Sequence, residues 1–530
     1  MSLLASALTS ADRSEVQLGE RIYREGVLVS GAPLQARRAS GDVSGAEAAC
    51  VLCHRRSGLG GTEGARLVPP VAARFLFTAR AATAAEMDRG HTRGPDLAHA
   101  FGRDRPRPPY SESSVLDAIR GGRSSSGDTL DPLMPRYVLG PQDGRALVAY
   151  LRQLSTRPSP GVSDTIVRLA TIVAPDVDPV RKRALLDVLQ AEVTLHNAAA
   201  RLDQLRDQSS PGASHVRYRR WELEVWPLEG PAPGWEAQLA SRYKAHPPFA
   251  LLSGLSEGEW GPVERFAERT GVPVWFPSVD LPPAAEGEFY SIYFSGGVGL
   301  EAGVIARRLT EIPRPGRVLV LHGSGLAEQQ AAQLLDQKME GTKARVEQRQ
   351  VEPASVAAAV ATVGPADALV LFARPAMLRA LDGVAPPAGP TYVSGLLGGA
   401  DAAPLPPAWK RSALVVYPFE LPERRKGNAS RFQAWMRARN LPIVDERVQA
   451  EAYLAAQLFS ARFEELSESI QREQLVERAE SFVAEHVSPV IFRSLQLGVG
   501  QRFASKGAYV VRFASPEGTA LRAESEWIVP

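Results

Sequence analysis

The sequence predicts a multidomain protein in which an all-α domain is followed by an α/β domain of two lobes. The length of 530 residues exceeds the size at which one hydrophobic core keeps growing. A Pro/Ser/Gly-rich linker at residues 158–164 separates domains at residues 1–157 and 165–530. Before the linker, apolar residues recur at helical spacing. After it, short apolar runs alternate with helical segments, which indicates a parallel sheet.

The composition is that of a folded chain with no general affinity for polyanions. Hydrophobic residues make up 44% and charged residues 23%, and the formal net charge is +2. We therefore expect no nucleic-acid partner. No run of eighteen apolar residues occurs, so we expect no membrane span. Residues 1–10 are mildly apolar but lack a positively charged start, and we interpret them as the remnant of a trimmed leader or as a misassigned start.

The two cysteines of the chain lie in one short motif. Residues 50–54 read Cys-Val-Leu-Cys-His. On one helical turn, Cys50 and Cys53 can each form a thioether with a haem vinyl group while His54 coordinates the iron. A thioredoxin-like motif would follow a strand, a zinc site would need two further ligands, and a disulfide between residues this close is geometrically awkward. The motif therefore predicts one covalently attached haem c.

Two amphipathic segments flank this motif. Residues 15–27 place Leu18, Ile22 and Tyr23 at helical spacing and contain Gly26 near the end, and residues 143–154 form a second stripe. Together with the haem motif, residues 14–156 resemble a class I cytochrome c. The resemblance implies that an N-terminal and a C-terminal helix cross beside the haem, that the protein is exported to the periplasm, and that it exchanges electrons with a redox partner protein.

The resemblance also implies a sixth iron ligand. Residues 133–137 read Leu-Met-Pro-Arg-Tyr, and similar cytochromes use the methionine of such a segment, so Met134 is the predicted ligand. Met87, His91 and His99, in a polar Gly/Pro-rich insertion, are the alternatives, because a His/His haem is also common. In similar proteins a proline carbonyl accepts the Nδ1 hydrogen bond of the haem histidine. Pro69-Pro70 stands at the corresponding distance, although it can also be a plain loop breaker.

The second domain alternates predicted strands and helices. The strand-like runs that carry a family resemblance are 170–176, 249–255, 271–278, 290–295, 317–322 and 368–373. They resemble the successive strands of a type I periplasmic binding protein, most of all the branch that binds branched-chain amino acids and amides. The resemblance implies two lobes that close around a small solute near the carboxyl ends of the strands.

The resemblance nominates residues at these strand ends as the solute site. Hydroxyls and backbone N–H groups there can hold a carboxylate, while Trp260 or Trp275 can cover an apolar group. The solute is expected to be an amino acid, an amide or a similar small molecule. The nominated residues are Ser253, Gly254, Ser256, Ser278, Ser295 and Tyr453, with Asp176 as a further candidate.

The sequence therefore predicts a periplasmic c-type cytochrome with electron-transfer activity coupled to a receptor-like solute-binding domain. The motifs of hydrolases, P-loop enzymes and metal-dependent enzymes do not occur, so we expect a carrier and binding protein rather than an enzyme. Two alternatives stay open. One is a peroxidase-like haem enzyme with a displaceable sixth ligand. The other is a receptor for an ABC-type transporter that carries the cytochrome as a passenger.

Overall fold

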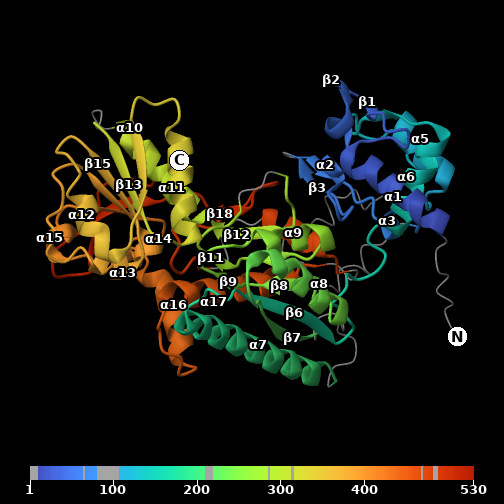
Figure 1. Cartoon of the computed structure of the whole chain (residues 1–530). Coiled ribbons are helices and arrows are strands. Elements are labelled where there is room, and N and C mark those ends of the chain that lie inside the picture. Colours follow the sequence, from blue (N-terminus) through green and yellow to red (C-terminus); the bar gives the residue numbers. More distant parts are fainter. Residues whose placement is uncertain are drawn as a thin grey trace. The chain divides into compact units, whose positions relative to one another are not determined.

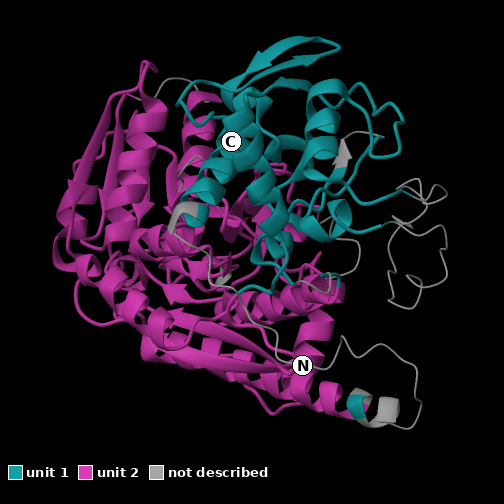
Figure 2. Ribbon diagram, turned by 90° about the vertical axis from the view of Figure 1, so that its right-hand side faces the viewer, with its two compact units in different colours: residues 1–159, 204–218, 465–477 teal, residues 160–203, 219–464, 478–530 magenta. Residues whose placement is uncertain are grey.

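The computed structural model divides the chain into two units (Figure 2). Unit 1 comprises residues 1–159, 204–218 and 465–477, and unit 2 comprises residues 160–203, 219–464 and 478–530. The structure describes residues 10–63, 66–79, 107–208, 219–283, 287–311, 316–466, 470–481 and 488–530. The segment 465–477 belongs to unit 1 although the two other segments of that unit end at residues 159 and 218.

The core of unit 1 is built where α1 (Ser10–Glu25) packs against α6 (Pro141–Gln153). Ile22 and Tyr23 of α1 and Leu147 and Leu151 of α6 are buried in one cluster. These helices confirm the two amphipathic segments predicted from the sequence. Close approach of the helices depends on Gly19, because a Cβ atom there would lie 1.9 Å from the carbonyl oxygen of Ala146.

Unit 1 also contains short strands that the sequence pattern does not reveal. β1 (Gln35–Arg38) pairs with β2 (Gly41–Ser44) and with β5 (Arg136–Val138), and β3 (Gly61–Glu63) pairs with β4 (Arg66–Val68). Strands of three or four residues are too short for an alternating pattern to be recognised. The remaining helices of this unit that matter here are α2 (Val51–His54), α3 (Ala73–Leu76) and α5 (Glu112–Gly121).

We expect Gly19→Ala to destabilise unit 1 by about 1–3 kcal/mol, because an added methyl group in a packed contact forces the helices apart. Hydrogen exchange of the α1 and α6 amides measures this loss. Gly121→Ala is the matched control, since a Cβ atom at Gly121 meets nothing within 4 Å. All eight tryptophans lie in unit 2, so tryptophan fluorescence should report an unchanged unfolding transition in both variants. Equal exchange rates in the two variants would contradict the packing argument.

Unit 2 contains two doubly wound sheets (Figure 1). The first has the order β7-β6-β8-β10-β12-β18 with parallel pairs, and β9 and β11 extend it beyond the end of β6. Its strands are β6 (Ile166–Val173), β7 (Arg220–Pro227), β8 (Ala250–Leu252), β9 (Leu255–Ser256), β10 (Val274–Trp275), β11 (Ser278–Val279), β12 (Ser291–Ser295) and β18 (Phe503–Ser505). The helices between them are α7 (Pro179–Gln208), α8 (Trp235–Ala245) and α9 (Gly261–Thr270).

The second sheet repeats this strand order and then adds two antiparallel strands at one edge. Its order is β14-β13-β15-β16-β17-β19-β20. The strands are β13 (Val318–His322), β14 (Val346–Gln350), β15 (Ala368–Phe372), β16 (Thr391–Ser394), β17 (Leu414–Tyr417), β19 (Tyr509–Phe513) and β20 (Leu521–Ala523). The helices that follow along the chain are α10 (Gly297–Glu311), α11 (Leu326–Met339), α12 (Val356–Val360), α13 (Pro375–Arg379), α14 (Gly395–Gly398), α15 (Pro407–Lys410), α16 (Lys426–Arg437) and α17 (Glu446–Phe463), and α17 contacts β8 and β11 of the first sheet. Of α18 (Arg472–Glu480), residues 472–477 belong to unit 1 and residues 478–480 to unit 2.

The parallel strands are continuous apolar runs because helices cover the sheet faces. Every residue of β13 and β15 is buried, and α10 and α11 pack on this second sheet. The two sheets confirm the two-lobed α/β fold predicted for the second part of the chain. In both sheets the strand order changes direction beside the first strand, so β6 and β8 in one lobe and β13 and β15 in the other frame the position where such folds bind ligands. Among the described helices, none is long and apolar enough to cross a membrane.

Candidate functional site

The haem motif forms a single turn of helix. Cys50 is the N-cap of α2, and its carbonyl oxygen accepts hydrogen bonds from the N–H groups of Cys53, at 3.3 Å, and His54, at 3.0 Å. The two cysteines form no disulfide with each other. Burial raises the pKa of Cys50 to about 12, although a hydrogen bond with the Tyr137 side chain opposes the rise. The hydrogen bond places Cys50 beside Tyr137, the tyrosine of the predicted Met-Pro-Arg-Tyr segment.

His54 is oriented by a backbone carbonyl. Its Nδ1 atom lies 3.0 Å from the carbonyl oxygen of Pro69, as the resemblance implied. Since a carbonyl only accepts hydrogen bonds, Nδ1 carries the proton and Nε2 is left with its lone pair. Burial lowers the pKa of His54, and the Pro69 contact partly offsets this. A neutral imidazole with a fixed ring and a free Nε2 is what coordination of a metal requires.

The turn after the motif is held against both core helices. The Tyr23 hydroxyl of α1 donates a hydrogen bond of 2.7 Å to the carbonyl oxygen of Arg55. Gly58 has a positive φ of 69°, and a Cβ atom there would lie 2.4 Å from Cδ2 of Leu154, just past α6. The carbonyl oxygen of Gly58 accepts hydrogen bonds from the N–H groups of Val71 and Ala72. Hydrogen bonds and close packing therefore fix the turn that follows the haem motif.

The residues around the motif fit a haem group. Met134 and Cys50 are both partly buried against the core cluster of unit 1, so the structure brings the predicted sixth ligand to the same core as the motif. Leu52, within the motif, and Leu133, beside Met134, are 55% and 47% exposed. These exposed leucine side chains are apolar surface that the apolar haem macrocycle could cover. The alternative ligands Met87, His91 and His99 lie outside the described residues.

The nominated solute residues of lobe one lie at strand ends but differ in what their side chains contact. Ser253 follows β8, is fully buried with a positive φ of 55°, and its Oγ has no hydrogen-bond partner among the described residues. Gly254 has a φ of 138°, and a Cβ atom there would lie 2.8 Å from the ring of Trp260. Ser256 donates from its Oγ to the carbonyl oxygen of Glu259 at 2.9 Å. Of these, Ser253 alone keeps an unused hydroxyl.

The other nominated residues serve internal contacts. Ser278 donates its hydroxyl hydrogen bond to Glu451 of α17. The Ser295 hydroxyl accepts a bond of 3.3 Å from the N–H of Gly297. The remaining three candidates are aromatic or acidic: Tyr453 packs against Phe432 and Trp435, Trp275 donates to the carbonyl oxygen of Ala455, and Asp176 follows β6.

A cluster of buried charges at the same strand ends was not predicted from the sequence. Asp280 follows β11 and is 1% exposed. Its carboxylate contacts Arg447 at 2.7 Å, Arg374 at 3.1 Å and Arg181 at 3.9 Å. Arg374 follows β15 of the second sheet and also pairs with Glu257, which follows β9 of the first, at 3.2 Å. We call these five residues the Asp280 cluster. Through Arg374, it joins the two lobes of unit 2.

Comparison with known families identifies the first unit. Residues 43–155 match the family model for cytochrome c, and this range contains the haem motif and Met134. Unit 1 contains a cytochrome c domain. The fit of the His54 and Pro69 geometry to a haem ligand agrees with this family. No curated protein matches the sequence.

Solved structures identify the fold of unit 2. A fatty acid ABC transporter substrate-binding protein from Thermomonospora curvata is 17% identical with a TM-score of 0.51, covering 71% of this chain and 95% of that one. A branched-chain amino acid ABC transporter protein from Thermus thermophilus, solved with bound valine, is 9% identical with a TM-score of 0.50, covering 69% and 97%. At such identities the likeness shows the fold, which is that of type I periplasmic binding proteins.

The charges of the Asp280 cluster are strongly coupled. Burial by itself would raise the pKa of Asp280, but Arg447, Arg181 and Arg374 outweigh it and lower the pKa to about 2. Asp445, the N-cap of α17, adds a further carboxylate 3.3 Å from Arg181. Asp280 therefore stays ionised across the neutral range.

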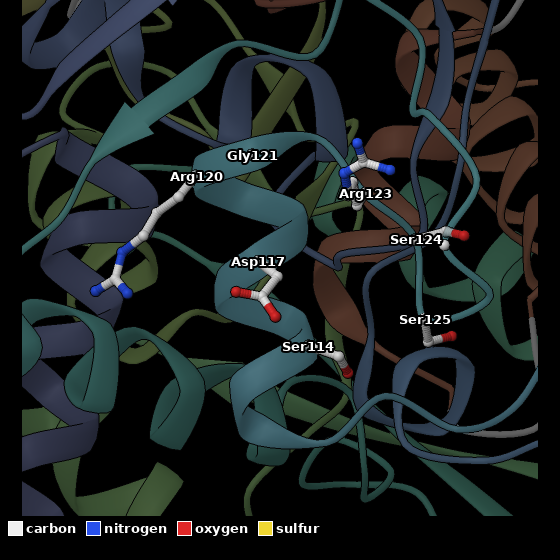
Figure 3. A pocket seen from close by; sticks show the side chains of 8 residues that line it. Ser114, Asp117, Arg120, Gly121, Arg123, Ser124 and Ser125 are labelled. Atoms are coloured by element: carbon white, nitrogen blue, oxygen red, sulfur yellow. The ribbon is translucent and has the colours of Figure 1, made fainter.

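An open hollow of about 580 Å³ lies elsewhere, on the cytochrome c domain (Figure 3). Ser114 and Asp117 reach it from α5, and Ser124 and Ser125 from the loop that follows. None of the predicted haem or solute residues lines it. It gives no support to either predicted site.

We expect the stability of unit 2 to fall as the pH drops from about 4 to about 2, because Asp280 has a folded pKa of about 2 against an unfolded value of about 3.9. The pairing contributes about 2 kcal/mol above this window and is lost as the carboxylate is protonated. Asp280→Asn should cost roughly 3–5 kcal/mol at neutral pH, because it leaves buried arginines without their partner, and it should flatten the acid response.

Tryptophan fluorescence during denaturant unfolding measures this effect, since all the tryptophans lie in unit 2. The exposed Asp382 provides the matched control Asp382→Asn, which should behave as the wild type. An Asp280→Asn variant with wild-type stability at neutral pH would show that the cluster does not hold the lobes together.

Proposed function

We propose that this chain is an exported, periplasmic c-type cytochrome that transfers electrons and is coupled to a small-solute-binding domain. One observation carries the first part. Cys50, Cys53 and His54 lie on one turn of helix, and the Pro69 carbonyl fixes the His54 ring with Nε2 free. The match of residues 43–155 to cytochrome c supports it.

Each residue of the site has one task in this proposal. Cys50 and Cys53 would bond one haem c covalently, and His54 and Met134 would ligate its iron. The bound haem supplies one-electron chemistry with a redox partner protein. Pro69 keeps the imidazole neutral and oriented. Tyr23 and Gly58 hold the turn that follows the motif, so little rearrangement is needed when the charge of the site changes.

We expect Met134→Ala to remove the sulfur-to-iron charge-transfer band of the ferric protein and to lower its midpoint potential, because a thioether ligand favours the ferrous state. Optical spectra and a potentiometric titration of the haem-loaded protein measure both. Leu133→Ala is the matched control, since Leu133 is the exposed neighbour of Met134. A band that survives in Met134→Ala would assign the sixth position to another residue, such as Met87.

Cyanide binding and peroxide turnover by the haem-loaded wild-type protein distinguish an electron carrier from a haem enzyme. Firm Met134 ligation predicts a ferric protein that resists cyanide and turns over peroxide slowly. Rapid peroxide turnover by the wild type, with ready cyanide binding, would instead establish the peroxidase-like alternative.

The second part of the proposal is a solute site at the carboxyl ends of the strands in unit 2. The repeated strand order supports a position beside β6 and β8 in one lobe and β13 and β15 in the other, because folds of this kind bind ligands where the strand order changes direction. Ser253, buried and with an unused hydroxyl, is the residue we assign to the solute. An amino acid, an amide or a similar small molecule suits the site, by likeness to the binding proteins of this fold.

A thermal-shift screen of amino acids, amides and short carboxylic acids tests this part, with tryptophan fluorescence as the readout. A solute present at a hundred times its Kd should stabilise unit 2 by about 2.7 kcal/mol. Ser253→Ala should weaken its binding by about tenfold, the equivalent of one hydrogen bond. Thr391→Val is the control, because Thr391 is also buried with an unused hydroxyl but lies at the start of β16.

An equal loss of solute affinity in Ser253→Ala and Thr391→Val would show that Ser253 does not bind the solute. A solute whose binding leaves the haem potential unchanged, together with docking of the protein to an ABC-type permease, would favour the alternative of a transport receptor with a passenger cytochrome.

A further inference from the structure

A segment from near the C-terminus completes the cytochrome c unit. Residues 465–477 belong to unit 1. The carbonyl oxygen of Ile470 accepts a hydrogen bond of 3.0 Å from the N–H of Ser159, and the Ser159 hydroxyl accepts one of 3.0 Å from the N–H of Arg472. The Gln471 side chain donates to the carbonyl oxygen of Arg157. These contacts fix the start of α18 on unit 1.

Glu477 of this segment binds the turn that follows the haem motif. One carboxylate oxygen accepts the N–H of Ser57 at 2.9 Å, and the other accepts the Ser57 hydroxyl at 2.5 Å. Ser57 is 1% exposed and Glu477 is 8% exposed. The carbonyl oxygen of Ser57 in turn accepts the hydroxyl of Ser155 at 2.6 Å. Glu477 therefore holds Ser57 by both backbone and side chain, in a place that water scarcely reaches.

Ser57 is closely tied to the predicted iron ligand. It is the third residue after His54, so the two Cα atoms are at most about 11 Å apart. Two backbone hydrogen bonds close the turn that contains Ser57. The N–H of Gly58 donates to the carbonyl oxygen of Arg55 at 3.2 Å, and the N–H of Gly60 donates to the carbonyl oxygen of His54 at 3.1 Å. A change at Glu477 is thus transmitted to the backbone of His54 through a short, fully bonded turn.

The surroundings of Glu477 allow its carboxyl to exist in both protonation states near neutral pH. Burial raises the pKa of Glu477 to about 7. The two hydrogen bonds from Ser57 and the positive charge of Arg55 act to lower this pKa, while the negative charge of Glu473 acts to raise it. Glu473 lies one turn earlier on α18 and pairs with Arg24 of α1 at 3.9 Å. The phenol of Tyr23, also on α1, faces the same region and stays protonated because burial raises its pKa.

We propose that Glu477 is a positioning residue of the haem site, which fixes the Ser57 turn and takes up a proton when the iron is reduced. The inference rests on the function proposed above. A ferric site carries one more positive charge than a ferrous site and so favours the ionised carboxylate. At a pH between the Glu477 pKa values of the two redox states, reduction by one electron from the redox partner is then accompanied, in part of the molecules, by transfer of a proton from water to the carboxylate of Glu477. By linkage, the midpoint potential falls as the pH rises.

The test is a spectroelectrochemical titration of the haem-loaded full-length protein, from two pH units below to two above the pKa of about 7. A tenfold difference in the proton affinity of Glu477 between the two redox states corresponds to a fall of about 59 mV across this range. Glu477→Gln retains an acceptor and a donor for Ser57 but cannot titrate. Its potential should be independent of pH here and should equal the acidic limit of the wild type.

Two further variants separate charge from structure. Ser57→Ala removes one hydrogen bond to the carboxylate, so the fall in potential should move to higher pH while its size is retained. Glu473→Gln is the control on the same helix. It removes a charge that raises the Glu477 pKa without touching Ser57, so the fall should move to lower pH.

A Glu477→Gln protein whose potential still falls with pH as in the wild type overturns the inference, and so does a Ser57→Ala protein with an unshifted profile. Failure of the proposed function looks different, because the wild-type protein would then carry no attached haem and give no potential to titrate. Hydrogen exchange at the Ser57 amide, faster in Glu477→Ala than in Glu477→Gln, reports the positioning role independently of the iron.

Discussion

The hydrogen bond between His54 Nδ1 and the carbonyl oxygen of Pro69 is the contact on which the cytochrome site depends. It leaves Nε2 as a lone-pair donor and fixes the ring relative to Cys53, the preceding residue, and Cys50, one turn earlier. In the proposed function one planar haem would bond to both sulfur atoms and to Nε2 of His54, so the turn would tolerate little movement. The surrounding unit supplies this rigidity through the Tyr23 hydroxyl, the close packing at Gly58 and the α1–α6 contact made possible by Gly19.

Unit 2 satisfies a different constraint. Its two sheets have the same strand order, so each lobe contributes loops to one position at the carboxyl ends of its strands. Asp280, Glu257 and Arg374 of the Asp280 cluster lie in loops at those ends, and Arg374 pairs across the two lobes. Arg181 and Arg447 reach Asp280 from α7 and α17. Buried ion pairs of this kind cost desolvation and contribute little net stability, but breaking one partner is expensive. The cluster therefore specifies how the lobes meet more than how strongly they hold together.

The features that the sequence predicted are local. Spacing alone places Cys50 and Cys53 on one turn, and apolar periodicity locates α1, α6 and the parallel strands to within a few residues. The features it missed connect distant residues. Glu477 meets Ser57 across 420 positions, and nothing in the pattern around either residue indicates the pairing. Asp280, Arg374 and Arg447 resemble surface charges in the sequence, because burial of an ion pair follows from tertiary packing. The three short strands β1, β2 and β5 carry too few residues for periodicity.

The proposed electron transfer requires a haem bonded through sulfur to Cys50 and Cys53. Intact-mass spectrometry of the protein matured in a host that attaches haem to such motifs, combined with alkylation of the denatured chain, tests for this bond. We expect a mass increased by one haem and no alkylation at either cysteine, which are the only two in the chain. A chain of unmodified mass in which both thiols alkylate freely would contradict it.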